Sequence, residues 1–456
     1  MTPKQVLEKQ KIFFFTDKTK SVDFRISQLK KLKSILKENE NILYDAIYSD
    51  FGKSKYEAFS TEISLVYSEI NSAIKNLPFW SHQKKVSTNL VNFPAKSYIL
   101  KEPYGNTLII GAWNYPLQLA LLPSISSLSA GNTVILKPSE LAQNCSVALK
   151  DLINKNFDVG YFNVIEGGVE ATTEILKLKF DKIFFTGSTR VGKIVYEAAA
   201  KNLTPVILEL GGKSPAIIFD DANLKITAKR IAWGKFLNAG QTCIAPDYIL
   251  VDEKIENKFL NELKIQLKNI FKKQNILTEN YVRIINQSRF DKLVTLINRK
   301  KIFYGGTYNK KTLHISPTIL SDVTFKDKVM REEIFGPILP VIKFKKIDEV
   351  ILKLKKMEKP LSFYVFSKNK KNSENIFGKL SFGGGALNDT LMHVANCSLP
   401  FGGVGASGIG SYHGENGFES FSHSKSIIDK PTWFEPFLKY PPYTKIKFWL
   451  MKLIMK

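Results

Sequence analysis

The spacing of apolar side chains predicts that residues 1–80 of the chain are helical. From Ile26 onward, apolar residues recur at helical spacing between lysines and glutamates, as at Leu29, Leu32, Leu36, Leu43 and Ile47. The character of the sequence changes at residues 84–101, where short β-prone pieces are interrupted by Asn and Pro. We expect an extended hairpin there that leaves the main body.

A regular alternation of apolar strands and helices begins at residue 106. Five segments are continuously apolar and are predicted as strands: residues 106–113, 133–139, 161–167, 182–188 and 204–212. The helices predicted between them are residues 116–131, residues 139–157 with a Ser cap at the start, residues 170–178 and residues 190–202. Such an alternation indicates an α/β fold with a doubly wound, Rossmann-like parallel sheet covered on both faces.

The pattern restarts after Gly212 and predicts a second α/β domain. Residues 214–219 are predicted as a strand, a long helix follows from about Ala222 to Leu237, and further signals continue to about residue 395. Ten of the 27 glycines fall between Gly383 and Gly417, so we expect loop-rich backbone without a packed element there.

Composition limits the class of protein. A length of 456 residues predicts two or three domains, and 44% hydrophobic with 24% charged residues excludes a disordered or fibrous chain. The net charge of +24 suits nucleic acid or an anionic membrane, but only seven of the 66 basic residues are Arg, the residue that reads bases and phosphates bidentately. We therefore expect a basic solvated surface and no nucleic-acid partner.

The cysteines and histidines predict neither disulfides nor a metal site. The three cysteines, Cys145, Cys243 and Cys397, lie far apart, and the five histidines lack zinc-ligand spacing. Reduced thiols suit an intracellular compartment. The N-terminal residues contain no signal-peptide core, and no stretch approaches the roughly 20 apolar residues of a membrane span. The expectation is a cytoplasmic protein.

A few residues and one turn could carry chemistry, and each also has an ordinary structural interpretation. Gly187, Ser188 and Gly192 join a strand to a helix, which suits a phosphate or is a plain tight turn. Cys243 follows a Gly and small polar residues, and it is either a nucleophile or a small buried hydrophobe. The second interpretation is kept for Cys145 and Cys397.

Two polar residues end apolar strands and could serve the same site. Glu209 could be a general base, because desolvation would raise its pKa, or it could merely reach solvent. Asn114 could donate to a developing oxyanion, or it could form the turn before Tyr115 and Pro116.

Taken together, the motifs resemble the aldehyde dehydrogenase superfamily along nearly the whole chain. The matching segments, in order, are GAWNYP, ILKPSE, FTGSTRVG, LELGGKSP, GQTCIAP, EEIFGP and PFGGVGASGIG. The chain is most similar to the class 3 and fatty aldehyde branch, on the short N-terminus, GQTCIAPDY and the segment SYHGENGFESFSHSKS. The match weakens between about residues 255 and 315, so nothing functional is carried over there.

The resemblance implies a reaction and a role for each matching residue. Cys243 would attack the aldehyde, Asn114 and the Cys243 backbone N–H would hold the oxyanion, and Glu209 would activate the water that hydrolyses the thioester. The cofactor would be NAD or NADP, since this branch can use both. It would meet Lys137, Glu140, Gly187, Ser188, Gly192, Glu333 and Phe335.

The resemblance also implies an architecture and a homodimer. The expected parts are an NAD(P)-binding domain of residues 1–80 and 102–208, a catalytic domain of residues 209–393, oligomerisation segments at 81–101 and 394–430, and a tail of residues 431–456. In the tail, four lysines lie among large apolar residues in the last twelve positions. An interfacial membrane helix and an arm that packs on a partner subunit both fit this pattern.

Three functions remain open at this stage. The first is hydrolytic oxidation of medium-chain, long-chain or aromatic aldehydes. The second is an acylating enzyme that passes the acyl group to coenzyme A, against which Glu209 argues, because such an enzyme needs no base for water. The third is a non-enzymatic dinucleotide-binding or nucleic-acid-binding protein, which the intact Cys243, Glu209 and Asn114 disfavour.

Overall fold

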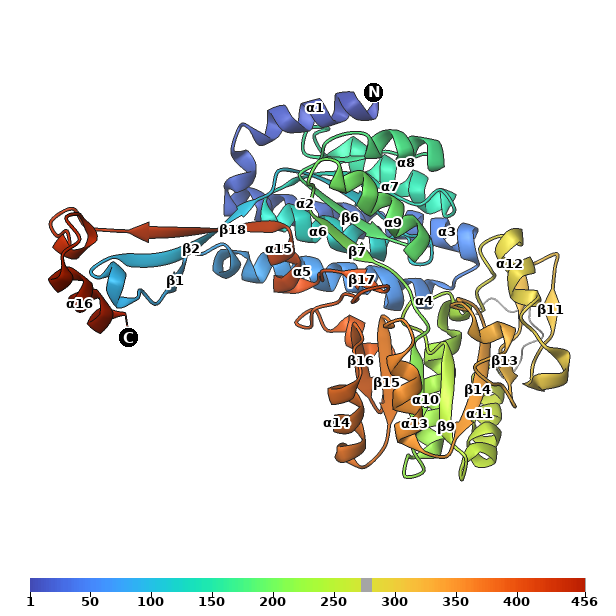
Figure 1. Cartoon of the computed structure of the whole chain (residues 1–456). Coiled ribbons are helices and arrows are strands. Elements are labelled where there is room, and N and C mark those ends of the chain that lie inside the picture. Colours follow the sequence, from blue (N-terminus) through green and yellow to red (C-terminus); the bar gives the residue numbers. More distant parts are fainter. Residues whose placement is uncertain (272–280, 456) are drawn as a thin grey trace.

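The computed structural model describes residues 1–271 and 281–455, arranged as two α/β bodies and a projecting sheet (Figure 1). One body is built on a six-stranded sheet, the other on a seven-stranded sheet, and a three-stranded sheet extends away from both. Among the helices of the described residues, none is both long and apolar enough to cross a bilayer. The predicted α/β class with parallel sheets is confirmed.

Helices form most of residues 1–80, as predicted. They are α1 (Pro3–Phe14), α2 (Val22–Glu38), α3 (Glu40–Phe51), α4 (Lys55–Ala58), the π-helical turn η2 (Phe59–Ile63) and α5 (Ser64–Trp80). The apolar stripe of α2 is buried at Leu29, Leu32 and Leu36, which packs this helix against the first body.

The first sheet has the order β17-β7-β6-β3-β4-β5. Its strands are β3 (Asn106–Ile110), β4 (Thr133–Lys137), β5 (Phe162–Val164), β6 (Lys182–Thr186), β7 (Val206–Glu209) and β17 (Gly408–Ile409). The five predicted strands pair in parallel, and β17 adds an antiparallel edge. Ile109 faces one apolar cluster, whereas Leu108 and Ile110 face another, so both faces are covered and the strand is continuously apolar.

The helices of the first body are α6 (Gln118–Ala130), α7 (Gln143–Asn156), α8 (Val169–Leu176) and α9 (Thr189–Ala200). The predicted start of α7 at Ser139 is wrong: the helix begins at Gln143 and has no side-chain cap of its own. Instead, the Asp50 carboxylate of α3 accepts hydrogen bonds from the backbone N–H groups of Asn144 (3.1 Å) and Cys145 (2.9 Å). A cap from a distant helix leaves no local signal in the sequence.

The second sheet has the order β10-β13-β14-β9-β8-β15-β16, parallel except at β10. Its strands are β8 (Pro215–Ile218), β9 (Tyr248–Asp252), β10 (Ile302–Tyr304), β13 (Thr318–Leu320), β14 (Ile338–Phe344), β15 (Ser362–Phe366) and β16 (Gly384–Leu387). The helices are α10 (Leu224–Phe236), α11 (Glu256–Ile270), α12 (Gln287–Val294), α13 (Ile347–Lys355) and α14 (Lys370–Lys379). A small hairpin, β11 (Tyr308–Asn309) and β12 (His314–Ile315), lies beside α12.

The prediction of plain loop between Gly383 and Gly417 is wrong. This stretch contains β16, β17 and the start of α15 (Gly414–Ser420). A Cβ at Gly385 would lie 2.1 Å from the Phe363 carbonyl oxygen, and one at Gly408 would lie 2.4 Å from that of Leu208. These glycines therefore permit close backbone approach within a sheet.

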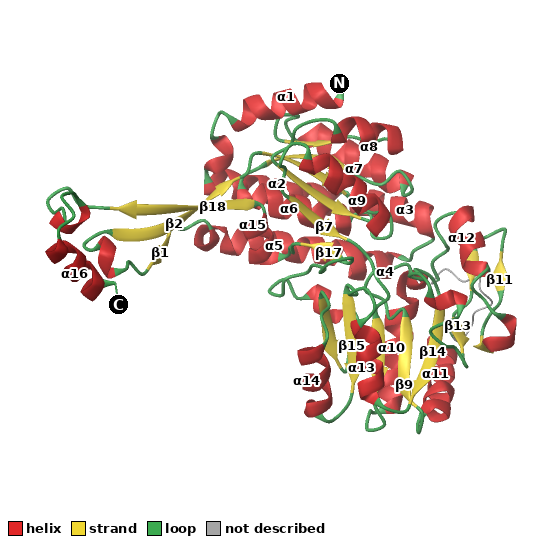
Figure 2. Cartoon of the chain, in the orientation of Figure 1, coloured by secondary structure: helices red, strands yellow, loops and turns green. Residues whose placement is uncertain are grey.

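The projecting sheet has the order β1-β2-β18 and includes the predicted hairpin. It is formed by β1 (Lys84–Val86), β2 (Lys96–Pro103) and the antiparallel β18 (Ser422–Asp429), which pairs with β2 over its whole length. Figure 2 shows these strands reaching away from the helical bodies, with α16 (Lys445–Ile454) at the far end.

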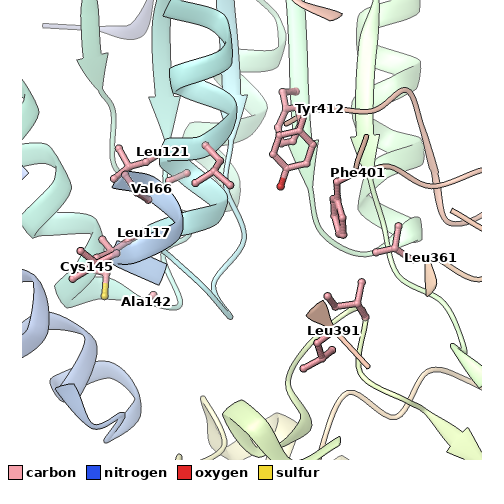
Figure 3. Packing of buried hydrophobic residues seen from close by; sticks show 14 of the residues in the cluster. Val66, Leu117, Leu121, Ala142, Cys145, Leu361, Leu391, Phe401 and Tyr412 are labelled. Carbon is pink, nitrogen blue, oxygen red and sulfur yellow. The ribbon is translucent and has the colours of Figure 1, made fainter. Parts of the chain in front are cut away.

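A buried ion pair lies where α4, α6 and the first apolar cluster meet. Lys53 Nζ is 2.8 Å from Glu62 Oε1, and neither side chain is exposed to solvent. The second carboxylate oxygen of Glu62 accepts the Leu117 backbone N–H (2.9 Å) just before α6. Val66, Leu117 and Leu121 belong to the large apolar cluster whose packing Figure 3 shows in part.

Replacing Lys53 with Met should destabilise the protein strongly, because the Glu62 carboxylate would stay buried without its partner. We expect a loss of about 3–5 kcal/mol in the free energy of unfolding, measured by urea denaturation. The matched change at exposed Lys55 should cost less than about 0.5 kcal/mol. Equal effects of the two substitutions would contradict this role for the ion pair.

Candidate active site

Three predicted residues meet between the two bodies. Asn114 follows β3, Glu209 ends β7, and Cys243 follows the turn η4 (Leu237–Gly240). Asn114 Nδ2 donates to the Gln241 carbonyl (3.1 Å), and the Glu209 charge acts on the Cys243 thiol. The carboxyl ends of the first sheet therefore face the Cys243 loop, which is where a parallel sheet places its ligands.

Burial dominates the electrostatics of the Cys243 thiol. It raises the pKa of the thiol, and the charges of Glu333 and Glu209 raise it further. The backbone N–H groups of Cys243 and Ile244 oppose this effect and lower the pKa of the thiol. A thiol in this setting needs a base to become a nucleophile, and the same N–H groups suit a developing oxyanion.

Glu209 is a carboxylate in apolar surroundings, as predicted. Its side chain is 2% exposed, and neither carboxylate oxygen accepts a hydrogen bond from the described residues. Burial raises the pKa of Glu209 well above its ordinary value. The backbone of Glu209 pairs with Thr186 of β6 on one side and Gly408 of β17 on the other, which fixes its position. A fixed, desolvated carboxylate is the form that a general base takes.

The turn between β6 and α9 fits a phosphate group. Ser188 caps α9 through its hydroxyl, which accepts the Val191 N–H (3.4 Å). The N-terminus of α9 therefore lies just beyond the carboxyl end of β6, where its partial positive charge suits an anion. A Cβ at Gly187 would lie 2.5 Å from the Phe185 ring, and one at Gly192 would lie 2.6 Å from the Leu210 side chain. A side chain at either position would therefore force the Phe185 or Leu210 side chain to shift, because this turn packs closely against the strands.

Lys137 and Glu140 are brought together at the end of β4. The Lys137 side chain is 2% exposed, and its Nζ donates to the Pro138 carbonyl (2.8 Å) and to Glu140 Oε2 (3.1 Å). Glu140 itself is exposed. A buried ammonium beside an exposed carboxylate provides a cation and an acceptor for the hydroxyl groups of a ribose.

Glu333 and Phe335 approach the site from the second body. Burial raises the pKa of Glu333 to about 8, and the Gly212 backbone N–H opposes this effect. A Cβ at Gly211 would lie 2.2 Å from Glu333 Oε2, so the Glu333 carboxylate lies directly against the Gly211 backbone. The Phe335 ring lies 5.4 Å from that of Trp113, which precedes Asn114. Lys137 thus ends β4, the Gly187 turn follows β6, and Glu333 lies against Gly211, just after β7.

Sequence reasoning missed the pair that fixes the Glu333 loop. Lys213 Nζ pairs with the Asp247 carboxylate and donates to the carbonyls of Val329 (3.0 Å) and Glu332 (2.9 Å). Asp247 Oδ1 accepts the Ile334 N–H (3.0 Å). Lys213 lies within LELGGKSP and Asp247 within GQTCIAPDY, but the two residues are 34 positions apart and their other partners lie near residue 330, so no spacing within a motif could reveal the contact.

Cys145 differs from Cys243 in its surroundings. Its side chain is fully buried, and burial followed by the Asp50 charge raises the pKa of its thiol well above the ordinary value. Its backbone N–H serves the Asp50 cap of α7. This agrees with the structural interpretation of Cys145.

Comparisons with known proteins agree with this geometry. Residues 14–427 match the model of the aldehyde dehydrogenase family. The chain belongs to that family. It is 48% identical over 448 residues to the 4,4'-diaponeurosporen-aldehyde dehydrogenase of Staphylococcus aureus, with 98% of this chain and 97% of the relative covered. It is 44% identical over 450 residues to aldehyde dehydrogenase family 3 member A2 of Pongo abelii, with 97% and 93% covered.

A solved aldehyde dehydrogenase structure also matches nearly the whole chain. The substrate-bound state of Staphylococcus aureus AldH superposes with a TM-score of 0.97 at 47% identity and covers 99% of each chain. The predicted family and its class 3 branch are confirmed. As a member of this family, the protein is an oxidoreductase that acts on aldehydes with NAD or NADP.

Replacing Glu209 with Gln should raise thermal stability at alkaline pH. A buried carboxyl with a raised pKa holds its proton more tightly in the folded protein than in the unfolded chain, where its value is near 4.5. Stability is therefore lost as the pH rises above that unfolded value. Calorimetry should give equal midpoints for the two proteins near pH 4.5 and, for the variant, a higher midpoint at pH 8, by on the order of 1–3 °C. A lower midpoint at pH 8 would contradict the desolvation of Glu209.

Proposed function

We propose that the chain oxidises an aldehyde to the carboxylic acid through a covalent thioester on Cys243. The bound dinucleotide supplies the acceptor for the hydride that leaves the aldehyde carbon. Lys137 and Glu140 would hold its adenosine ribose, the turn at Gly187, Ser188 and Gly192 its pyrophosphate, and Glu333 with Phe335 its nicotinamide ribose.

In the first half of the reaction, the Cys243 sulfur bonds to the aldehyde carbon. The carbonyl oxygen becomes an oxyanion, which the Asn114 amide and the Cys243 backbone N–H stabilise. Loss of hydride from the carbon restores the C=O bond and leaves a thioester. Because burial and two nearby carboxylates raise the pKa of the thiol, its proton must pass to a base before attack.

In the second half, Glu209 takes a proton from the water that attacks the thioester carbon. The sulfur–carbon bond breaks, the carboxylic acid is released and the Cys243 thiol is regenerated. A carboxylate in an apolar setting has the raised pKa that this proton transfer needs near neutral pH.

The observation that carries this proposal is the buried Glu209 carboxylate, whose charge raises the pKa of the Cys243 thiol. Asn114 contacts the loop of the same thiol through the Gln241 carbonyl. An acylating enzyme that uses coenzyme A has no need for such a base, and a non-enzymatic binding protein has no need for any of the three groups. The hydrolytic reaction uses all of them.

We propose medium-chain, long-chain or aromatic aldehydes as the substrates. Aromatic rings crowd the region of Glu209 and Cys243, since Phe401 packs edge-on against Tyr412, and the Tyr412 ring against Phe184. The relative from Staphylococcus aureus is named for a diaponeurosporen aldehyde, which supports an apolar substrate.

We propose a homodimer that forms through the projecting sheet. β18 pairs on one side only within the described residues, so the other edge of this strand is left to pair with another chain. A canine relative that is 43% identical is named a dimeric, NADP-preferring aldehyde dehydrogenase.

Replacing Cys243 with Ala should abolish aldehyde oxidation and leave dinucleotide binding intact. We expect a loss of at least about 10³-fold in kcat, followed as NADH or NADPH absorbance. Cofactor binding, followed by fluorescence, should be unchanged. Turnover by the variant would overturn the covalent mechanism.

Product analysis separates the hydrolytic from the acylating enzyme in the same assay. The wild-type protein should release free carboxylic acid without coenzyme A. The Glu209→Gln variant should form about one equivalent of reduced cofactor per site and then stall. A strict requirement for coenzyme A would refute hydrolysis.

We further propose that α16 binds an anionic membrane surface as an interfacial helix that lies along that surface. No residue of α16 is buried. One side of the helix is anchored by Lys447, whose ammonium lies over the Phe437 ring and donates to the Tyr440 carbonyl. The exposed residues are Ile446 (71%), Phe448 (63%), Trp449 (61%) and Leu453 (59%). Residues 436–456 contain five lysines and no acidic residue, as expected of an interfacial helix.

Flotation with vesicles tests this proposal on the full chain. The wild-type protein should float with vesicles that contain phosphatidylglycerol, and the Trp449→Glu variant should not. The control, Ile12→Glu, introduces the same charge at an exposed apolar residue of α1 and should float normally. Failure of the wild-type protein to float, or dissociation of a dimer by Trp449→Glu without any change in flotation, would overturn the proposal.

A further inference from the structure

Asn238 joins the two loops that carry the proposed oxyanion donor and nucleophile. Its side chain is 1% exposed and lies in η4, five residues before Cys243. The amide nitrogen donates to the Asn114 backbone carbonyl (2.9 Å) and to the Gln241 carbonyl (3.1 Å). One NH₂ group therefore spans the gap between a loop of the first body and a loop of the second.

The backbone at Asn238 is held in an unusual conformation. Asn238 and Ala239 both have φ of 51°, and Gly240 has φ of 71°, so three successive residues are left-handed. In this left-handed turn the Gln241 backbone N–H donates to the Asn238 carbonyl (3.1 Å), and the chain then continues to Cys243. Left-handed non-glycine residues carry a cost of about 1 kcal/mol or more each, and Asn tolerates this region better than most residues.

A carboxylate on a third segment fixes Asn238 from behind. The Asn238 backbone N–H donates to Glu57 Oε1 (2.9 Å) on α4. The charge of Lys53 acts on Glu57, and Lys53 also forms the buried ion pair with Glu62. Glu62 in turn accepts the backbone N–H of Leu117, three residues after Asn114. The segment of residues 53–62 thus contacts both loops.

These contacts control the position of the Asn114 loop relative to the Cys243 loop. Asn114 and Cys243 belong to different bodies, and no strand pairing connects the two loops within the described part of the chain. An oxyanion donor must lie about 2.7–3.1 Å from the oxygen it stabilises, and a displacement of about 1 Å can cost on the order of 100-fold in rate. The Asn238 amide hydrogen-bonds to the Asn114 carbonyl in one loop and to the Gln241 carbonyl, two residues before Cys243, in the other.

We propose that Asn238 is a positioning residue for aldehyde oxidation, which sets the Asn114 amide relative to Cys243, and that Glu57 holds Asn238 in place. The inference rests on the proposed function, because it takes Asn114 as the oxyanion donor and Cys243 as the nucleophile. Asn238 itself touches neither reacting atom.

Two substitutions separate the amide from the backbone conformation. Asn238→Gly keeps the left-handed backbone without strain and removes the amide, whereas Asn238→Ala removes the amide and also strains the backbone. We expect both to lower kcat about 10–100-fold, with cofactor affinity unchanged. Only Asn238→Ala should also lower the thermal midpoint clearly. Wild-type kcat in Asn238→Gly would overturn the proposal.

A double variant tests whether Asn238 acts through Asn114. Asn114→Ala alone should lower kcat about 10²–10³-fold. If Asn238 serves to place the Asn114 amide, adding Asn238→Gly to Asn114→Ala should cost less than about 3-fold more, because the placed group is already gone. Multiplication of the two single effects would contradict the proposal.

The Glu57 part of the proposal has its own matched pair. Glu57→Gln keeps an oxygen that can accept the Asn238 N–H and should retain most of the activity. Glu57→Leu removes the acceptor and should lower kcat toward the Asn238→Gly value, with the cofactor Kd unchanged. Equal kcat in the two Glu57 variants would overturn this part.

The outcome can be distinguished from failure of the proposed function. Turnover by Cys243→Ala would remove the proposed function itself. An inactive Cys243→Ala variant together with a fully active Asn238→Gly variant would remove only the positioning role.

Discussion

The buried contact between Lys53 and Glu62 is the constraint on which the site depends. Two charges without exposed surface are tolerated only because they are paired and hydrogen-bonded, and here the remaining carboxylate oxygen binds the start of α6. The same short segment provides Glu57 for the Cys243 loop. The N-terminal helices therefore contribute no reacting group to the proposed mechanism, yet they contact both loops that do.

Desolvation is a cost to the fold and a benefit to the proposed chemistry. Glu209 ends a strand without a hydrogen-bond partner among the described residues, and burial raises the pKa of its carboxyl. The same effect raises the pKa of Glu333 to about 8 and that of the Cys243 thiol. Groups that share this dry region therefore hold their protons more tightly than they would in water, and the Cys243 thiol must lose its proton to a base before it can attack.

The sequence predicted the parallel sheet, and it also supplied the residues of the proposed site, because both leave local signals. Apolar runs indicate buried strands, and Asn114, Glu209 and Cys243 stand in motifs that resemble those of a family. It did not predict the Asp50 cap, the Lys213–Asp247 pair or the Asn238 bridge, since each joins residues that only the fold brings together. The glycines near residue 400 were misread as loop, because a glycine needed for close strand packing is indistinguishable in sequence from one in a turn.

Those glycines connect the end of the chain to its proposed catalytic centre. β17 pairs with β7 at Glu209, and the Ser407 carbonyl accepts the Leu210 N–H (3.1 Å). Thr189, in the turn proposed for the pyrophosphate, donates to the Ala406 carbonyl (3.1 Å). A segment far away in sequence thus covers the strand of the base and contacts the cofactor turn. Because β18 follows the same segment after α15, one continuous stretch of chain both covers β7 and forms an edge of the projecting sheet.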